Sequence, residues 1–187
     1  QAGRPRAWAV PEAARRGARE ALRAAGAEPD GPYAVVHPGA GSPGKCWPLE
    51  RFFDLARRLP QPVFVLGEVE LDRWSAGPLA AVRDRFPTLA CPPLDALAGA
   101  LAGASVFVGN DSGPSHLAAA VGAPPVALFG PTRPEHFSPV GPAVRVVAAR
   151  EVAAVSVSRV EAAVRSLAAG GRAADEARRA SRGRRRP

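Results

Sequence analysis

The clearest strand-to-helix unit of the chain lies at residues 105–122, with the sequence SVFVGNDSGPSHLAAAVG. Its first residues are β-rich and mostly apolar, and they lead into a short turn of glycine and polar residues. Asp111 and Ser112 are residue types that cap helices, and Pro114 suits the first helical position. The alanine-rich pattern at 114–121 predicts a helix that packs closely on its neighbours. This stretch therefore predicts a buried strand, a polar turn and a helix in direct succession.

The same alternation of strand and helix patterns continues on both sides of this unit. Most β-rich runs are apolar throughout, as expected for strands that are buried on both faces. Single helices between such strands imply right-handed crossovers and a parallel sheet. The sequence therefore predicts an α/β fold, a Rossmann-like parallel sheet of about six strands with helices on both faces. The predicted strands are 33–37, 62–66, 88–90 (a weaker pattern), 105–109, 126–129 and 144–147, and the predicted helices are 11–26, 49–59, 70–85, 95–102, 114–121 and 157–167.

The composition fits one domain with a packed core, because 47% of the 187 residues are hydrophobic. With only two cysteines, Cys46 and Cys91, the chain can form neither a disulfide-stapled scaffold nor a four-cysteine zinc site. No apolar run approaches the roughly 20 residues that a membrane-spanning helix needs. The sequence contains no methionine and opens at Gln1, so we expect a fragment or a trimmed product.

The net charge of +8 is concentrated near the C-terminus. Residues 172–187 contain seven arginines and two acidic residues, a net +5, whereas residues 31–171 carry a net +1. We predict three parts: a helix and linker at 1–30, a Rossmann-like domain at 31–171, and a disordered, solvated Arg-rich tail at 172–187. Attraction of the tail to anionic lipid or nucleic acid is the less favoured alternative, and nucleic acid is disfavoured further because no aromatic residue follows Phe137.

A glycine-rich loop, HPGAGSPGKCWP at 37–48, follows the first predicted strand. Ligands of open parallel sheets bind beyond the carboxyl ends of the strands, where this loop lies. Gly39 and Gly41 allow backbone N–H groups to approach a ligand closely. Lys45, the only lysine of the chain, can act as a point charge for phosphate. The loop matches neither the Walker pattern nor the dinucleotide pattern, so these residues alone leave an ordinary turn as the alternative.

The turn at 109–113 is the strongest candidate for an anion-binding site. Free N–H groups at the start of a helix, together with the helix dipole, favour an anion such as a diphosphate. His116 lies in the first helical turn and can add a donor to the same anion. One alternative is a capped helix with a surface histidine, and another is a nucleophile at Ser112 or Ser115 with His116 and Asp111. Consecutive residues on one turn rarely align a hydroxyl, an imidazole and a carboxylate, which disfavours the nucleophile.

Two further loops follow predicted strands. The proline-rich loop at 130–139 could form a wall of the same cleft, and Glu68 or Glu70 after the strand at 62–66 could accept hydrogen bonds from ribose hydroxyls. The histidines and carboxylates lack the spacing of metal ligands, and no Asp-x-Asp pair is present, so no metal site is expected.

In this order, the segments resemble glycosyltransferase family 9, the ADP-heptose:lipopolysaccharide heptosyltransferases and their relatives. The resemblance covers about residues 31–168 and implies the GT-B arrangement, two facing Rossmann-like domains. This chain would be the C-terminal half, with residues 31–171 as its nucleotide-sugar-binding domain. The motifs that carry the resemblance are His37-Pro-Gly-Ala-Gly-Ser with Lys45 and Trp47-Pro48, then Gly109-Asn-Asp-Ser-Gly-Pro-Ser-His116-Leu-Ala-Ala-Ala, then Leu128-Phe-Gly-Pro-Thr132-x-Pro134.

The resemblance also implies a role for individual residues. Lys45 would stabilise the leaving group, while the general base would be an aspartate of an N-terminal acceptor domain. Glu70 and Thr132 would contact the nucleoside and the sugar, and no metal or cofactor would be needed. The residues implied to bind the donor diphosphate are Asp111, Ser112, Gly113, His116, Gly39, Ala40, Gly41 and Ser42.

The implied function is metal-independent, inverting transfer from a nucleotide-diphosphate sugar such as ADP-heptose to a lipopolysaccharide-type glycolipid or saccharide acceptor. The expected location is the cytoplasm, peripheral at the inner membrane face. We expect this half to bind donor without turning over by itself. The family often has an acid where Arg133 stands, a basic residue where Cys46 stands and a tryptophan near Phe137, so Arg133 bears on the identity of the sugar. The alternative function is a non-catalytic nucleotide- or phosphate-binding module, or a truncated remnant.

Overall fold

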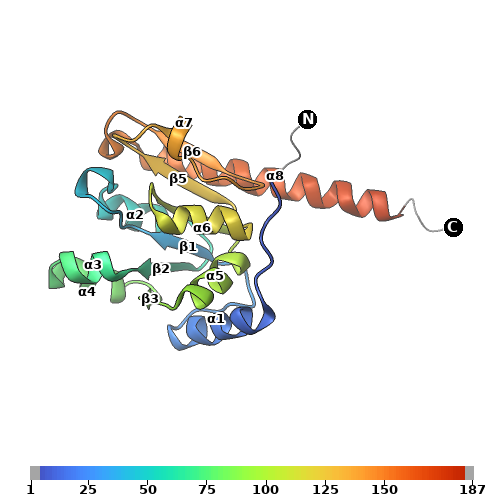
Figure 1. Cartoon of the computed structure of the whole chain (residues 1–187), viewed down its shortest axis with the longest axis horizontal. Helices are drawn as coiled ribbons and strands as arrows, with labels where there is room; N and C mark the ends of the chain where they lie inside the picture. The colour runs from blue at the N-terminus through green and yellow to red at the C-terminus, as the bar shows by residue number, and fades with distance from the viewer. Residues whose placement is uncertain (1–4, 184–187) are drawn as a thin grey trace.

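The structure, a computed structural model that describes residues 5–183, contains one six-stranded sheet (Figure 1). The strand order is β3-β2-β1-β4-β5-β6, and each neighbouring pair is parallel. The predicted Rossmann-like α/β fold is therefore confirmed, including its weak strand at 88–90. The strands are β1 (Ala34–His37), β2 (Pro62–Leu66), β3 (Thr88–Ala90), β4 (Val106–Asn110), β5 (Pro125–Phe129) and β6 (Arg145–Ala148).

Helices cover both faces of this sheet, as the apolar strands predict. Leu22 of α1 and Leu101 of α5 are buried against one face, together with Val35 of β1. Phe52 of α2 and Val160 of α8 are buried against the other face. The α-helices are α1 (Glu12–Ala24), α2 (Leu49–Ala56), α3 (Glu68–Arg73), α4 (Ala76–Arg83), α5 (Leu94–Gly103), α6 (Gly113–Val121), α7 (Pro134–Phe137) and α8 (Val157–Gly183), and the 3-10 helices are η1 (Pro43–Lys45) and η2 (Val152–Ala154).

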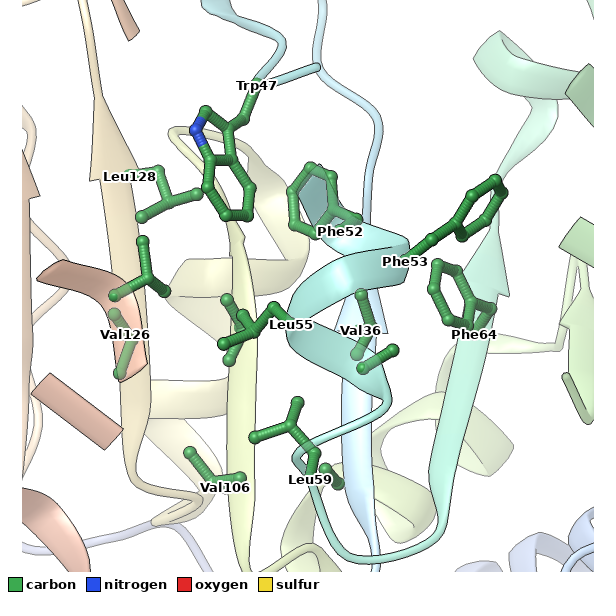
Figure 2. Close-up of a cluster of buried hydrophobic side chains, with 14 of the residues drawn as sticks. Val36, Trp47, Phe52, Phe53, Leu55, Leu59, Phe64, Val106, Val126 and Leu128 are labelled. Carbon is green, nitrogen blue, oxygen red and sulfur yellow. The ribbon is translucent and has the colours of Figure 1, made fainter. Parts of the chain in front are cut away.

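An aromatic cluster fixes α2 on the sheet (Figure 2). Trp47 and Phe52 meet edge to face with ring centroids 4.9 Å apart, and Phe53 packs against Phe64 of β2 at 6.0 Å. The indole Nε1 of Trp47 donates a hydrogen bond of 2.8 Å to the carbonyl of Val155, so the one polar atom of this buried ring is satisfied. Burial of these rings fixes α2 and, with it, the glycine-rich loop that precedes α2.

The prediction of one continuous helix at 70–85 is wrong, because the structure contains two shorter helices there, α3 and α4. Pro78 explains the break. In a continuous helix its ring would clash with the carbonyl four residues earlier, that of Trp74. Trp74 is instead extended, and α4 begins at Ala76, so Pro78 falls in a first turn where its missing N–H has no cost.

Helix α8 extends beyond the predicted helix at 157–167 and reaches Gly183, so the structure is helical over 172–183, where the sequence predicts a disordered tail. Alanine, arginine and glutamate are good helix formers, and no proline occurs between Pro142 and Pro187, which accounts for the continuation. Figure 1 shows α8 projecting past the sheet. The last four residues of the predicted tail, 184–187, lie outside the described residues. Among residues 5–183, no helix combines the length and apolar character needed to cross a membrane.

Tyr33, the only tyrosine of the chain, reports on the alkaline limit of this fold. Its Oη donates a hydrogen bond of 2.6 Å to the carbonyl of Ala100, and burial raises the pKa of the phenol to about 12. An unfolded tyrosine ionises near pH 10, so the unfolded state loses this proton first. We predict constant stability from this group below pH 10 and a loss of stability between pH 10 and 12. Urea unfolding at a series of pH values, alongside ultraviolet titration of the phenol, measures both effects.

The matched control for this prediction is Tyr33→Phe, which keeps the ring and removes the titrating group. The variant should lose about 1 kcal/mol at neutral pH with its hydrogen bond, and its stability should change less between pH 10 and 12. Equal pH dependence in both proteins would contradict the assignment.

Candidate functional site

The candidate site lies where β1 and β4, neighbours in the sheet but far apart in the chain, end side by side. His37 at the end of β1 is paired in register with Gly109 of β4. The strand order reverses direction at this pair, and such a switch point leaves a crevice beyond the carboxyl ends of the strands. The loops that follow β1, β2, β4 and β5 therefore converge here, as the sequence predicts.

Asn110, which was not among the predicted site residues, connects the loop after β1 to the turn after β4. Its side chain is completely buried, and its Nδ2 donates to the carbonyls of Pro38 at 2.8 Å and Gly39 at 3.2 Å. Its Oδ1 accepts a hydrogen bond of 3.0 Å from the backbone N–H of Trp47. One amide therefore holds both ends of the glycine-rich loop against the end of β4. The available signal was its position: it is the only asparagine of the chain and directly follows an apolar strand.

Three of the predicted site residues, from three different loops, meet in one polar cluster. Lys45 Nζ lies 2.8 Å from Asp111 Oδ2, and the hydroxyl of Thr132 donates to the same oxygen at 2.8 Å. Asp111 is 7% exposed, while the Lys45 side chain retains 29% of its exposure. A carboxylate thus holds an accessible ammonium group at the edge of the sheet, beside the start of α6.

The start of α6 leaves the backbone N–H of Gly113 for a ligand, since Pro114 has no N–H and that of Ser115 donates to the carbonyl of Ser112 at 3.1 Å. Ser112 occupies the N-cap position but makes no side-chain capping hydrogen bond, because its hydroxyl donates to the carbonyl of Asn110 at 3.2 Å. Gly113 is exposed, and a Cβ at that position would meet no atom within 4 Å. His116 is exposed on the first turns of the same helix. This combination of a free N–H group, a helix dipole and a nearby ammonium suits an anion.

The nucleophile alternative finds no support in these contacts. Both Ser112 and Ser115 donate their hydroxyls to the carbonyl of Asn110, Ser115 at 2.6 Å. Within the described part of the chain, neither hydroxyl is hydrogen-bonded to His116. The serines therefore tie the turn to its own backbone.

A cavity of about 400 Å³ adjoins this helix start and extends toward β2 and β3. Predicted site residues that line it are Ala40, Gly41, Glu70, Ser112 and Gly113. Lys45, Asp111, Thr132, His116, Gly39 and Ser42 are not among its lining residues. Some predicted site residues thus line the cavity, while Lys45, Asp111 and Thr132 form a separate polar cluster.

Glu70 lies at the base of this cavity and is only 2% exposed. Its Oε2 accepts a hydrogen bond of 2.7 Å from the N–H of Gly67, the residue before α3. Gly39 is buried against the same carboxyl group, because a Cβ at position 39 would lie 1.7 Å from Glu70 Oε1. Gly39 therefore gives room to a carboxylate, a role that differs from the predicted contact with phosphate.

His37 is buried beside Glu70 and also lines the cavity. Its Nδ1 lies 3.0 Å from the carbonyl of Val65. Burial lowers the pKa of His37, and the nearby Glu70 carboxylate opposes this effect in part. Burial also raises the pKa of the Cys46 thiol, which disfavours its reactive thiolate form. In residues 5–183 no three His, Cys, Asp or Glu side chains are grouped to hold a metal ion; the predicted metal-independent mechanism stays a prediction.

Residues 5–164 match the family model of glycosyltransferase family 9 (heptosyltransferase). Lipopolysaccharide heptosyltransferase 1 of Pseudomonas aeruginosa is 37% identical over 113 residues, which are 59% of this chain and 32% of that protein. Lipopolysaccharide heptosyltransferase 3 of Escherichia coli is 34% identical over 113 residues, 54% of this chain and 32% of that protein. The matched part thus spans about a third of each curated relative.

Solved structures give the same picture at the level of the fold. E. coli ADP-heptose lps heptosyltransferase II superimposes with a TM-score of 0.72 and 25% identity, over 86% of this chain and 53% of that one. The E. coli heptosyltransferase WaaC with ADP gives a TM-score of 0.63 and 28% identity, over 73% and 44% of the two chains. The chain therefore matches about half of each of these heptosyltransferase structures.

The first site prediction concerns the buried amide. Asn110→Ala leaves the N–H of Trp47 and two carbonyls without partners, and we expect it to lower the free energy of unfolding by about 2–4 kcal/mol. Urea unfolding monitored by tryptophan fluorescence measures the change. Glu135→Ala, an exposed substitution on α7, is the control and should change stability by less than about 0.5 kcal/mol. Similar values for the two variants would contradict the role given to Asn110.

The second prediction compares two glycines of one loop. In Gly39→Ala the new Cβ displaces the Glu70 carboxyl group, so Gly67 loses its hydrogen-bond acceptor and stability falls by about 1–2 kcal/mol. In Gly41→Ala the Cβ meets no atom within 4 Å, and stability should be unchanged. Denaturant unfolding of both variants tests the difference, and equal free energies would show that Gly39 does not serve Glu70.

Proposed function

The chain belongs to glycosyltransferase family 9, and from this we propose that it is the donor-binding, C-terminal half of a heptosyltransferase-type enzyme. Its substrate would be a nucleotide-diphosphate sugar, with ADP-heptose as the first candidate because one similar solved structure is an ADP-heptose heptosyltransferase. The acceptor would be a lipopolysaccharide-type glycolipid or saccharide, as the names of the curated relatives suggest. Work on such an acceptor would take place in the cytoplasm at the inner membrane face.

The observation that carries this proposal is the position of Lys45 beside the free N-terminus of α6. The ammonium is held 2.8 Å from Asp111 and is partly exposed, and Asp111 lies two residues before Gly113, whose N–H has no partner among the described residues. A diphosphate placed here would receive backbone hydrogen bonds and one point charge. Because Asp111 already balances Lys45, the arriving phosphate would have to compete with a carboxylate for the ammonium.

The cavity beside this cluster suits the other end of the donor. Its lining combines apolar side chains such as Val65 and Leu97 with the buried carboxylate of Glu70. An acidic residue after the second strand of a Rossmann-like fold is placed to accept hydrogen bonds from ribose hydroxyls. The nucleoside would therefore lie in the cavity, and the phosphates would extend toward Lys45.

In the proposed mechanism the site stabilises the negative charge that develops on the leaving nucleoside diphosphate. In inverting transfer an acceptor hydroxyl attacks the anomeric carbon, and the bond to the nucleoside diphosphate breaks with its electrons on the phosphate oxygen. Lys45, the N–H groups of α6 and His116 would stabilise that developing negative charge without a metal. The base that takes the acceptor proton would come from an N-terminal acceptor domain. Thr132 and Arg133 would face the sugar, since Thr132 is bonded to Asp111 at the same edge.

Calorimetric titration with ADP, GDP and UDP tests the proposal directly. We expect saturable binding of one of them, and a loss of about 10- to 100-fold or more in affinity in the double variant Lys45→Ala/His116→Ala, because charge-assisted hydrogen bonds to phosphate are lost. The corresponding nucleoside, without phosphates, should bind both proteins equally. Glu20→Ala, an exposed substitution on α1 and outside the site, should bind as the unchanged chain does.

If the folded chain binds none of the three diphosphates, the proposal of an autonomous donor-binding half is wrong. Equal binding by the double variant would mean that the phosphates lie elsewhere. The first outcome would favour a truncated remnant, whereas the second would keep nucleotide binding and overturn only the phosphate contacts proposed for Lys45 and His116.

A further inference from the structure

His37 carries a second ring nitrogen that the proposed function does not use. The residue closes β1 at the switch point, is 4% exposed and lines the cavity. The carbonyl of Val65 can only accept a hydrogen bond, so the Nδ1 atom, 3.0 Å away, must be the protonated nitrogen and donate. In the neutral ring the Nε2 atom is then an acceptor with a free lone pair.

The Nε2 atom of His37 is accessible from the cavity. It has no hydrogen-bond partner among the residues that the structure describes. In the described part of the chain, every side-chain nitrogen or oxygen that is fully shielded from solvent has a hydrogen-bond partner. The Nε2 atom therefore has contact with solvent, and the space that His37 lines is the cavity. An almost fully buried side chain thus presents one unpartnered acceptor to a ligand site.

The base of the cavity contains acceptors and negative charge. Its lining residues include the acidic side chains Glu68 and Glu70 and contain no lysine or arginine. Phosphate would be repelled there, whereas a neutral group with two neighbouring donors would satisfy both the Glu70 carboxylate and the His37 nitrogen. The vicinal hydroxyls of a ribose have that arrangement. Burial, which lowers the pKa of His37, keeps the ring neutral and accepting at neutral pH.

We propose that His37 is a ribose-binding residue, whose Nε2 accepts a hydrogen bond from one of the two ribose hydroxyls while Glu70 accepts from the other. The site would thereby select ribonucleotides over deoxyribonucleotides. This inference rests on the proposed binding of a nucleoside diphosphate in the cavity. It adds a residue of the β1 strand end to a site otherwise built from loops and helix starts.

Two variants of His37 separate this contact from a structural role. His37→Asn places an amide N–H near the Nδ1 position, so it can still donate to Val65 but has no acceptor at the Nε2 position. His37→Gln is longer and can offer its carbonyl oxygen near the Nε2 position. The ligands are whichever of ADP, GDP and UDP binds the unchanged chain best, with its 2′-deoxy and 3′-deoxy forms, titrated calorimetrically at pH 7.5.

The unchanged chain should bind each deoxy form about 3- to 10-fold more weakly than the ribonucleotide, because each lacks one hydrogen bond. In His37→Asn the penalty for one of the two deoxy forms should disappear, to within about twofold, while that deoxy form binds the variant as well as the unchanged chain. That equality also shows that the variant is folded. His37→Gln should restore at least part of the lost discrimination.

Three outcomes would overturn the inference or its premise, and they are distinguishable. If His37→Asn keeps both penalties, His37 does not contact the ribose although the nucleotide binds. If the unchanged chain binds ribose and deoxyribose forms equally, the cavity does not recognise the hydroxyls, and the proposed function still stands. If the unchanged chain binds no nucleoside diphosphate, the proposed function itself fails.

Discussion

The buried amide of Asn110 is the interaction on which the arrangement of this site depends. Parallel strands end at one edge, but their loops are free to diverge, and nothing in the sheet itself brings the loop after β1 to the turn after β4. Asn110 does so with three hydrogen bonds, to Pro38, Gly39 and Trp47. A side-chain amide is suited to this work because it both donates and accepts, and because burial makes any alternative pairing costly.

The constraint set by Asn110 produces a site with two electrostatic ends. Lys45 and the start of α6 form one end, which would stabilise negative charge. Glu70 and His37 form the other end, which offers hydrogen-bond acceptors. A ligand that carries phosphates at one end and hydroxyl groups at the other can bind in only one orientation. The family of the chain and the charge pattern of the site are independent of each other, and both favour the proposed nucleoside diphosphate.

The sequence predicts the sheet well, because the four central strands, β1, β2, β4 and β5, are almost entirely buried and mostly apolar. It also predicts which residues gather, since Lys45, Asp111 and Thr132 meet as expected from three loops. It does not predict the pairing partners of Asn110 or the contact of Gly39 with Glu70, because both depend on segments 30 or more residues away. The length of α8 was not predicted for a different reason. A helix that projects past the sheet has no face to bury there, so its sequence needs no apolar periodicity.

The glycine-rich loop shows how a motif can combine two requirements that look alike in sequence. Gly41 and Gly44 face open space, and Gly41 lines the cavity, where a ligand would approach its backbone. Gly39 faces the interior, where any side chain would displace the Glu70 carboxyl group. Gly39 thus makes room for the carboxyl group that would bind the ribose, while Gly41 lines the cavity. Packing therefore requires a glycine at position 39, whereas at position 41, two residues later, the fold itself has room for a side chain.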